Sequence, residues 1–288
     1  MLQMKTENNL VTKIEKLVLM LNRDPGYCVL TGAGCSTASG LPAYRNIKGD
    51  WQHDKPMEHQ DFIGSEFKRK VYWARSQRGW PNFKMARPNQ THNMLTELQH
   101  SGYVSQIITQ NVDRLHQASG SKAVIDLHGR LDQVICLDCN KTISRHDFQQ
   151  RLESVNYAHC SLHGVIRPDG DVEISTDALS DFLVPRCEYC YGELKPDVVF
   201  FGGVLNPQTA ADALNAIDNA PGLIVVGSSL MVYSGFRLVK RAIELRKPVV
   251  IINQGTTRAD DLYTLKIDHE SGQVLTEIGI ALNDDSPN

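Results

Sequence analysis

Residues 27–36 read YCVLTGAGCS, and this stretch decides the fold class. Its first four residues form a short apolar run, as expected for a buried strand, and Gly32 and Gly34 follow directly. Glycines after a strand let the backbone approach a pyrophosphate, and a following helix would offer unpaired N–H groups to the anion. A plain tight turn would have the same sequence. The dinucleotide-binding motif of dehydrogenases is G-x-G-x-x-G, and Thr37 occupies the position of its third glycine. NAD would therefore bind here in a different pose.

The rest of the chain extends this pattern. Helical spacing over 10–21 predicts a helix before the first strand, and helical patterns separate several of the later apolar runs. Short apolar runs that alternate with helices are typical of a parallel sheet covered on both faces. We therefore predict an α/β fold with a Rossmann-like parallel sheet and helices on both faces. The further strands are expected at 104–108, 124–127, 198–201, 223–226 and 249–252.

Two stretches interrupt the alternation of strands and helices. Residues 41–90 show little strand pattern and are too long for a turn, so we expect a helical or loop excursion over the ligand site. Residues 132–196 hold five of the seven cysteines and are expected to form a small inserted module. The predicted domains are therefore a nucleotide-binding domain over 1–131 and 197–288, with the module at 132–196 between its two parts.

The module contains two C-x-x-C pairs, Cys136/Cys139 and Cys187/Cys190. Two such turns supply the four thiolates of a tetrahedral zinc site, and a filled four-cysteine shell leaves no position for water, so the zinc is expected to be structural. A redox dithiol is the alternative for a single pair. Other residues between the pairs could compete as ligands, namely His159, Cys160 and His163.

Composition limits the function classes. The 288 residues carry 30 basic and 33 acidic side chains, a net charge of −3, which gives no general reason to bind nucleic acid or a membrane surface. No run of 18 apolar residues is present, and the first 21 residues lack the pattern of a secretory or transit peptide. We expect a cytoplasmic protein in which the cysteines are thiols or metal ligands.

Polar clusters follow several of the predicted strands. Besides the glycine loop they are Gln110-Asn111-Val112-Asp113, Gly227-Ser228-Ser229 and Asn253-Gln254-Gly255. The carboxyl ends of parallel strands line one crevice, so these clusters are expected to converge on a nucleotide site. His128 follows the strand at 124–127 and is the best general-base candidate, with a structural histidine as the alternative.

Together these residues resemble the sirtuins, the NAD-dependent protein deacylases, over nearly the whole chain. The stretch 72–75 and the first cysteine pair look like the class II branch. The motifs that carry the resemblance are Gly32-Ala33-Gly34-Cys35-Ser36, Pro42-Ala43-Tyr44-Arg45, Thr109-Gln110-Asn111-Val112-Asp113, Leu127-His128-Gly129, the two cysteine pairs, the run 195–202 (KPDVVFFG) and Gly227-Ser228-Ser229-Leu230.

The resemblance implies that NAD is a consumed reagent and that one Zn²⁺ is structural. It implies catalytic roles for His128, Asn111 and Asp113, with His128 deprotonating a ribose hydroxyl. A substrate peptide would add a strand between 201–204 and 230–233, with its acyl-lysine in an apolar tunnel. The implied NAD-binding residues are Gly32, Ala33, Gly34, Ser36, Thr37, Tyr44, Arg45, Trp51, Gln110, Asn111, Val112, Asp113, Gly227, Ser228, Ser229, Asn253, Gln254, Gly255 and Ser271.

Tyr72 and Arg75 are three residues apart and would share a helix face. We hypothesise that they face the acyl tunnel, as such a pair does in sirtuins that prefer acidic acyl groups, where arginine can hold a carboxylate in a bidentate manner. A surface or structural arginine is the alternative.

The expected function is an NAD-dependent protein-lysine deacylase acting on acylated lysines of proteins or peptides, as a monomer without nucleic-acid or membrane partners. Protein mono-ADP-ribosyl transfer or NAD hydrolysis at the same site is the alternative. A non-catalytic NAD sensor and a zinc-dependent nucleic-acid module are disfavoured, the first by the presence of His128 and Asp113 and the second by the net charge.

Overall fold

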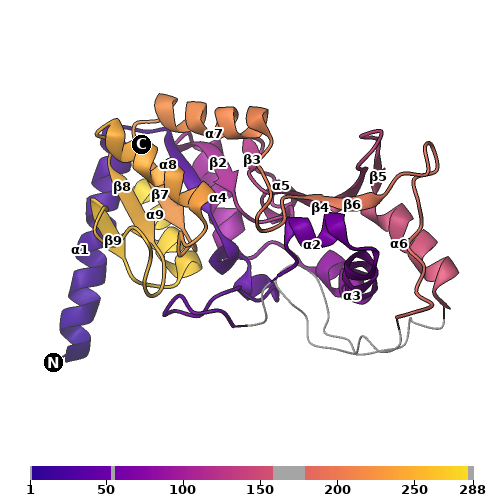
Figure 1. The fold of residues 1–288 in the computed structure, drawn as a ribbon. Helices are drawn as coiled ribbons and strands as arrows, with labels where there is room; N and C mark the ends of the chain where they lie inside the picture. Colours follow the sequence, from indigo (N-terminus) through magenta and orange to yellow (C-terminus); the bar gives the residue numbers. More distant parts are fainter. Residues whose placement is uncertain (1, 53–55, 158–178, 285–288) are drawn as a thin grey trace.

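The structure, a computed structural model, describes residues 2–52, 56–157 and 179–284. Its larger lobe is built on a six-stranded sheet of order β3-β2-β1-β7-β8-β9, in which every neighbouring pair is parallel (Figure 1). The predicted Rossmann-like sheet is confirmed. Its strands are β1 (Tyr27–Thr31), β2 (Val104–Thr109), β3 (Val124–Asp126), β7 (Leu223–Val226), β8 (Val249–Ile252) and β9 (Leu265–Ile267).

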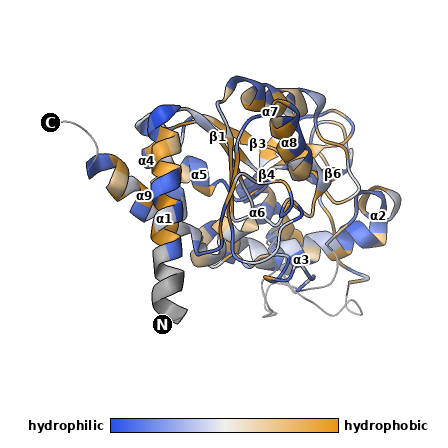
Figure 2. Cartoon of the chain, turned by 90° about the vertical axis from the view of Figure 1, so that its left-hand side faces the viewer, coloured by the Kyte–Doolittle hydropathy of each residue, from blue (hydrophilic) through white to orange (hydrophobic). Residues whose placement is uncertain are grey.

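Helices cover both faces of this sheet because strand residues alternate between two cores. Val29 packs into one core and Leu30 into the other, as the two-residue period of a strand requires. The helices α1 (Leu2–Arg23), α4 (Gln90–His100) and α9 (Ser271–Asp284) pack on the face of Val29. The helices α7 (Pro207–Asn219) and α8 (Tyr233–Glu244) pack on the face of Leu30. The coloured part of helix α1 alternates hydrophobic and hydrophilic residues, as a helix with one buried face does (Figure 2).

A smaller lobe is built from two separate parts of the chain (Figure 1). One part supplies an antiparallel sheet of order β5-β4-β6 and helix α6. The other supplies α2 and α3, and Trp73 of α3 packs 4.5 Å from the ring of Phe148 on α6. Both parts are needed to close one core. The elements are α2 (His59–Gly64), α3 (Glu66–Met85), β4 (Gly129–Cys136), β5 (Thr142–Ser144), α6 (Arg145–Val155) and β6 (Leu194–Val198).

The prediction that residues 198–201 form a strand of the parallel sheet is wrong. Strand β6 ends at Val198 and pairs antiparallel with β4, outside the parallel sheet. Phe200 then packs against Phe62 and Tyr72 in the small lobe, with ring centroids 5.1 Å from each. The run is apolar because its side chains fill an aromatic cluster. The sequence pattern of such a buried run is the same as that of a buried strand, so periodicity alone does not separate the two.

The helix expected after the glycine loop is also absent. Two three-residue 3₁₀ turns, Ala33–Cys35 and Thr37–Ser39, follow the loop, and Gly40 ends them with a φ of +84°. No helix of eight or more residues therefore offers its amino terminus at this loop. No helix among the described residues combines the length and apolar composition needed to cross a membrane.

Candidate active site

A cavity of about 620 Å³ lies where the carboxyl ends of the central strands face the small lobe. From β1 the chain adds β2 and β3 towards one edge of the sheet. It later adds β7, β8 and β9 towards the opposite edge, so the strand order reverses between β1 and β7. Open parallel sheets bind their ligands at such a reversal. The volume is in the range of small-molecule and cofactor sites.

Nearly all the residues that the sequence predicted for the site line this cavity. Two predicted residues do not, namely Gly255, whose N–H donates to Asp268 Oδ1 at 3.0 Å, and Arg75. Those that line it are Gly32, Ala33, Gly34, Ser36, Thr37, Tyr44, Arg45, Trp51, Tyr72, Gln110, Asn111, Val112, Asp113, His128, Gly227, Ser228, Ser229, Asn253, Gln254 and Ser271.

The glycine loop is held by a second glycine loop after β7. The N–H of Gly34 donates to the carbonyl of Gly227 at 2.9 Å. A Cβ on Gly34 would lie 2.8 Å from that carbonyl oxygen, and one on Gly227 would lie 2.5 Å from the nitrogen of Cys35. Gly227 also has a φ of +59°, which favours glycine. These glycines therefore bring two strand-end loops into backbone contact, a reason for glycine that the sequence analysis did not identify.

Asn111 and Asp113 meet at Ser36. The Ser36 hydroxyl donates to Asp113 Oδ2 at 2.6 Å, and Asn111 Nδ2 donates to Ser36 Oγ at 3.1 Å and to the carbonyl of Gly32 at 3.0 Å. Burial raises the pKa of Asp113, and the hydrogen bonds from Ser36 and the N–H of Leu115 oppose that rise. The network ties the segment after β2 to the loop after β1.

His128 is held from both ring nitrogens. Its Nδ1 lies 3.0 Å from the carbonyl oxygen of Gln110, and its Nε2 lies 2.7 Å from the hydroxyl of Ser234. Burial lowers the pKa of His128, and the hydrogen bond to the Gln110 carbonyl opposes that change. The ring is therefore held neutral, the form that can accept a proton. Ser234 also lines the cavity and was missed, because a serine at a helix start shows no pattern.

An aromatic wall closes another side. The guanidinium of Arg45 lies 4.0 Å from the ring centroid of Trp51, and Arg45 Nη1 donates to the carbonyl of Gly49 at 2.7 Å. The rings of Tyr44, Trp51 and Phe201 pack edge to face, with centroids 5.6–6.4 Å apart. A cation thus faces the cavity over an apolar surface.

Tyr72 and Arg75 differ in their surroundings. Tyr72 lines the cavity, is only 1% exposed and packs against Phe62 and Phe200. Arg75, one helical turn further along α3, is half-buried and lies outside the lining, and its Nε is buried without a hydrogen-bond partner in the described structure.

The four paired cysteines come together at one end of the small lobe. Their sulfurs all lie within 4.8 Å of one another, with Cys136 and Cys190 3.5 Å apart and Cys139 and Cys187 3.7 Å apart. A tetrahedral zinc with Zn–S bonds of about 2.3 Å requires sulfurs ~3.8 Å apart, so this donor set fits one structural Zn²⁺. The competing candidates His159, Cys160 and His163 lie outside the described residues.

Comparison with known proteins agrees with this geometry. Residues 32–234 match the profile of the Sir2 family. The chain belongs to the Sir2 family. A curated relative of the family, the NAD-dependent protein deacetylase of Xanthomonas campestris, is 49% identical over 247 residues, which are 86% of this chain and 84% of the relative. The NAD-dependent protein deacylase Sirt4 of Drosophila melanogaster is 42% identical over 269 residues, or 92% and 86% of the two chains.

Solved Sir2 structures show the same arrangement. A Sir2 complex with a p53 peptide and NAD⁺ matches this fold with a TM-score of 0.77 at 29% identity and covers 95% of this chain and all of that one. A Sir2 structure bound to a propionylated peptide matches with a TM-score of 0.75 at 30% identity, over 93% of this chain and 98% of the other. This Sir2 chain therefore shares both lobes of the fold with structures that hold NAD⁺ or an acylated peptide.

Proposed function

We propose that this Sir2 protein is an NAD-dependent protein-lysine deacylase, which transfers the acyl group of a modified lysine to ADP-ribose and releases nicotinamide. The observation that carries the proposal is the neutral, half-buried imidazole of His128 in the cavity that Asn111 and Asp113 also line. A general base must be unprotonated and must reach its substrate, and His128 has a lowered pKa and lines the cavity in which the substrate would bind.

The cavity suits NAD. Its lining supplies the cation of Arg45 for phosphates and polar side chains at Asn253 and Ser228 for the adenosine half. When bound, NAD supplies a ribose carbon that becomes electrophilic as nicotinamide leaves. Fixed polar groups such as Asn111 and Asp113 would orient the nicotinamide ribose and stabilise the positive charge that develops on it at low reorganisation cost.

The acylated peptide is assigned to the edge of the same cavity. Residues 201–203 and 230–232 both line it, and an extended peptide would add as a strand between them. The acyl-lysine would then enter between Tyr72, Phe200 and Val198, which are apolar or aromatic. Proton removal by Nε2 of His128 from a ribose hydroxyl would make that oxygen the nucleophile for the activated acyl carbon.

Incubation of the purified protein with NAD and a panel of acyl-lysine peptides, followed by mass analysis of peptide and nucleotide products, tests the function. We expect deacylated peptide, nicotinamide and acyl-ADP-ribose, all lost in His128→Ala, since general-base catalysis contributes about 100-fold or more. Lys48→Ala is the control, because Lys48 lies outside the lining of the cavity. ADP-ribosylated protein with intact acyl groups would instead identify a mono-ADP-ribosyltransferase, and ADP-ribose alone an NAD hydrolase.

The proposal keeps the division of the chain into an NAD-binding domain, 1–131 and 197–288, and a zinc-binding module, 132–196. It also places the protein in the cytoplasm as a monomer, without nucleic-acid or membrane partners. The buried free thiols of Cys28 and Cys35 and the thiolate zinc site support a reducing compartment. The resemblance of the sequence to class II sirtuins stays a prediction.

A further inference from the structure

The hydrogen bonds of His128 determine which ring nitrogen carries the proton. The Gln110 carbonyl oxygen, 3.0 Å from Nδ1, can only accept, so Nδ1 must carry a hydrogen. In a neutral ring Nε2 then has a free lone pair. The hydroxyl of Ser234, 2.7 Å away, therefore donates to Nε2.

We propose that Ser234 is a positioning residue for His128, which holds the Nε2 lone pair at a fixed place in the cavity until a substrate hydroxyl arrives. The proposal rests on the proposed deacylase function and goes one step further, from the base to the group that orients it. Without Ser234, the ring would be fixed only at Nδ1 and could rotate about that single contact.

The start of α8, which carries Ser234, packs directly against Gln110. Ser234 lies in the first turn of α8, and Gly235 beside it packs so closely on Gln110 that a Cβ there would lie 2.6 Å from Gln110 Oε1. Gln110 Nε2 in turn donates to Ser228 Oγ at 2.8 Å and to the carbonyl of Thr31 at 3.2 Å. The start of α8 therefore supplies the contact to Nε2 and also packs against the residue that holds Nδ1.

The hydroxyl can serve the ring before and after proton transfer. Before transfer it donates to Nε2, which leaves no buried lone pair unpaired. When a substrate ribose hydroxyl gives its proton to Nε2, the Ser234 O–H can rotate and its oxygen can accept from the new N–H. Ser234 keeps its own proton throughout, so the only proton that moves is the one from the ribose oxygen to Nε2.

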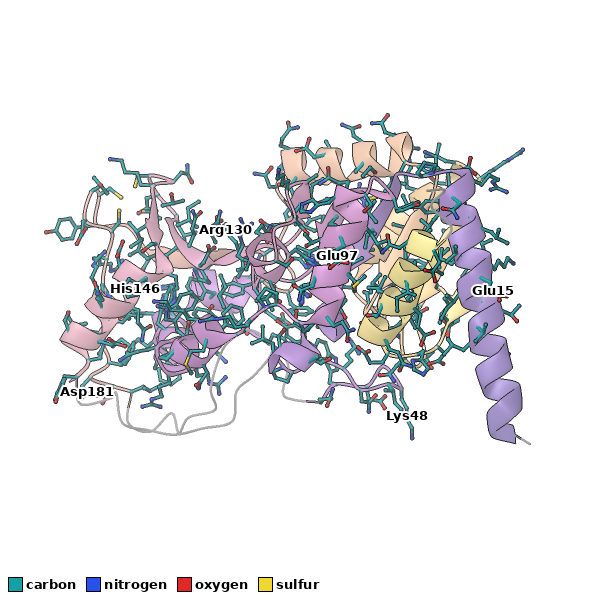
Figure 3. The ribbon with its side chains drawn as sticks, turned by 180° about the vertical axis from the view of Figure 1, so that it is seen from behind. Glu15, Lys48, Glu97, Arg130, His146 and Asp181 are labelled. Carbon is teal, nitrogen blue, oxygen red and sulfur yellow. The ribbon has the colours of Figure 1, made fainter. Side chains whose placement is uncertain are left out.

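The charged residues closest to His128 along the chain have ionic partners of their own. On the flanking strand β4, Arg130 makes a two-point ion pair with Asp132, with both distances 2.6 Å, and it lies where the two lobes join (Figure 3). On β3, Asp126 pairs with Arg114. The hydrogen bonds that the ring itself makes in the described structure are those to Gln110 and Ser234.

The test compares Ser234→Ala, Ser234→Thr and the control Ser105→Ala. Ser105 is exposed on β2, outside the cavity lining, and its hydroxyl also makes one short hydrogen bond, 2.7 Å to the carbonyl of Gly26. We expect Ser234→Ala to lower kcat for deacylation by about tenfold, the upper range for one hydrogen bond, with KM for NAD changed by less than ~2-fold. Ser234→Thr restores kcat, and Ser105→Ala keeps it.

A readout independent of turnover is the ¹⁵N NMR spectrum of the His128 ring, measured without substrate at a pH well above its pKa. In Ser234→Ala the Nε2 resonance should move towards the position of an unbonded ring nitrogen, while Nδ1 stays protonated. An unchanged Nε2 resonance, or an unchanged kcat in a folded Ser234→Ala, would overturn the proposal. If wild-type protein deacylates nothing but the resonance still moves, the hydrogen bond stands, and the proposed function together with the role in deacylation is wrong.

Discussion

His128 and Asp113 line the same cavity, and burial acts on their pKa values in opposite directions. It lowers the pKa of the imidazole and raises that of the carboxyl, since in both cases it disfavours the charged form. The hydrogen bonds from Ser36 and Leu115 act against this at Asp113. The pKa of each side chain therefore reflects opposing effects of burial and hydrogen bonding, and removal of one hydrogen bond is expected to shift that pKa further in the direction that burial favours.

Arg75 is the residue that we propose sets acyl preference. Its buried Nε has no partner in the described structure, and an acidic acyl chain reaching past Tyr72 would supply an acceptor. We expect Arg75→Met to lower turnover of succinyl and glutaryl peptides by about tenfold or more and to leave acetyl turnover nearly unchanged. Steady-state kinetics on the three peptides measure this.

Lys68→Met is the matched control for Arg75→Met, because Lys68 is an exposed cation on the same helix. An equal loss of turnover on all three peptides would identify Arg75 as a structural arginine, the alternative that the sequence left open. Its position outside the cavity lining makes this comparison necessary.

Two buried histidines give the fold a dependence on pH. His92 and His116 have ring centroids 4.8 Å apart, and burial lowers their pKa values to about 4 and about 3, with the charge of His92 also lowering that of His116. Both are therefore neutral when folded, whereas in the unfolded chain they bind protons below pH ~6.5. Their contribution to stability is complete above pH ~6.5 and is lost as the pH falls from there towards the folded-state values of about 4 and about 3.

Urea unfolding followed by circular dichroism measures this loss. Within that window each histidine is expected to lower the free energy of unfolding by about 1.4 kcal/mol per pH unit. The His92→Gln/His116→Gln double variant should show a smaller slope than wild type over the same range. Equal slopes would mean that other groups cause the acid sensitivity.

At the scale of elements, the contact between the two glycine loops holds β1 to β7 at the cavity. Gly34→Ala would place a methyl group 2.8 Å from the carbonyl oxygen of Gly227, and backbone cannot move away cheaply. We expect a loss of about 1–3 kcal/mol in the free energy of unfolding, as for overpacked interiors, and a raised KM for NAD. Chemical denaturation and steady-state kinetics measure the two effects.

Gly64→Ala is the control for the glycine-loop variant. A Cβ at Gly64, in the exposed last turn of α2, meets no atom within 4 Å. Its stability and KM should stay at wild-type values or improve slightly, because alanine favours a helix over glycine. A Gly34→Ala protein as stable as this control would show that the loops can separate without cost.

The elements that were predicted correctly are those whose burial produces a simple pattern of apolar residues in the sequence. Strands buried on both faces, such as β7 and β8, read as continuous apolar runs and were placed correctly. The polar clusters at strand ends met at one cavity because parallel strands end at one edge. The run 198–201 was predicted wrongly because an aromatic cluster buries it as completely as a sheet would. Ser234 could not be predicted from the sequence, because only the packing of α8 on Gln110 brings it to His128.

At the scale of the whole molecule, the four-cysteine site stabilises a lobe with a modest core of its own. Cys136 and Cys187 belong to the same buried cluster as Trp73 and Phe148, so loss of the metal is expected to loosen that cluster. Elemental analysis should find one zinc per chain. Removal of zinc with a chelator should lower the thermal midpoint and abolish deacylation, because the small lobe forms one wall of the cavity.

Readdition of Zn²⁺ should restore both properties, and Mg²⁺, which prefers oxygen ligands, should restore neither. Cys139→Ser should behave like the chelated protein. A protein that keeps its midpoint and activity without zinc would exclude a structural role for the metal.

The construction of the small lobe from two separate segments has a consequence for synthesis. Helix α3 ends at Met85, and its partner α6 begins at Arg145, 60 residues later (145 − 85 = 60). At 5–20 residues per second, a ribosome needs roughly 3–12 s to make the intervening chain. During that interval the apolar face around Tyr72 and Trp73 has no partner from α6 or β6. We therefore expect the nascent chain to expose an apolar surface, of the kind that chaperones bind, which the folded protein buries.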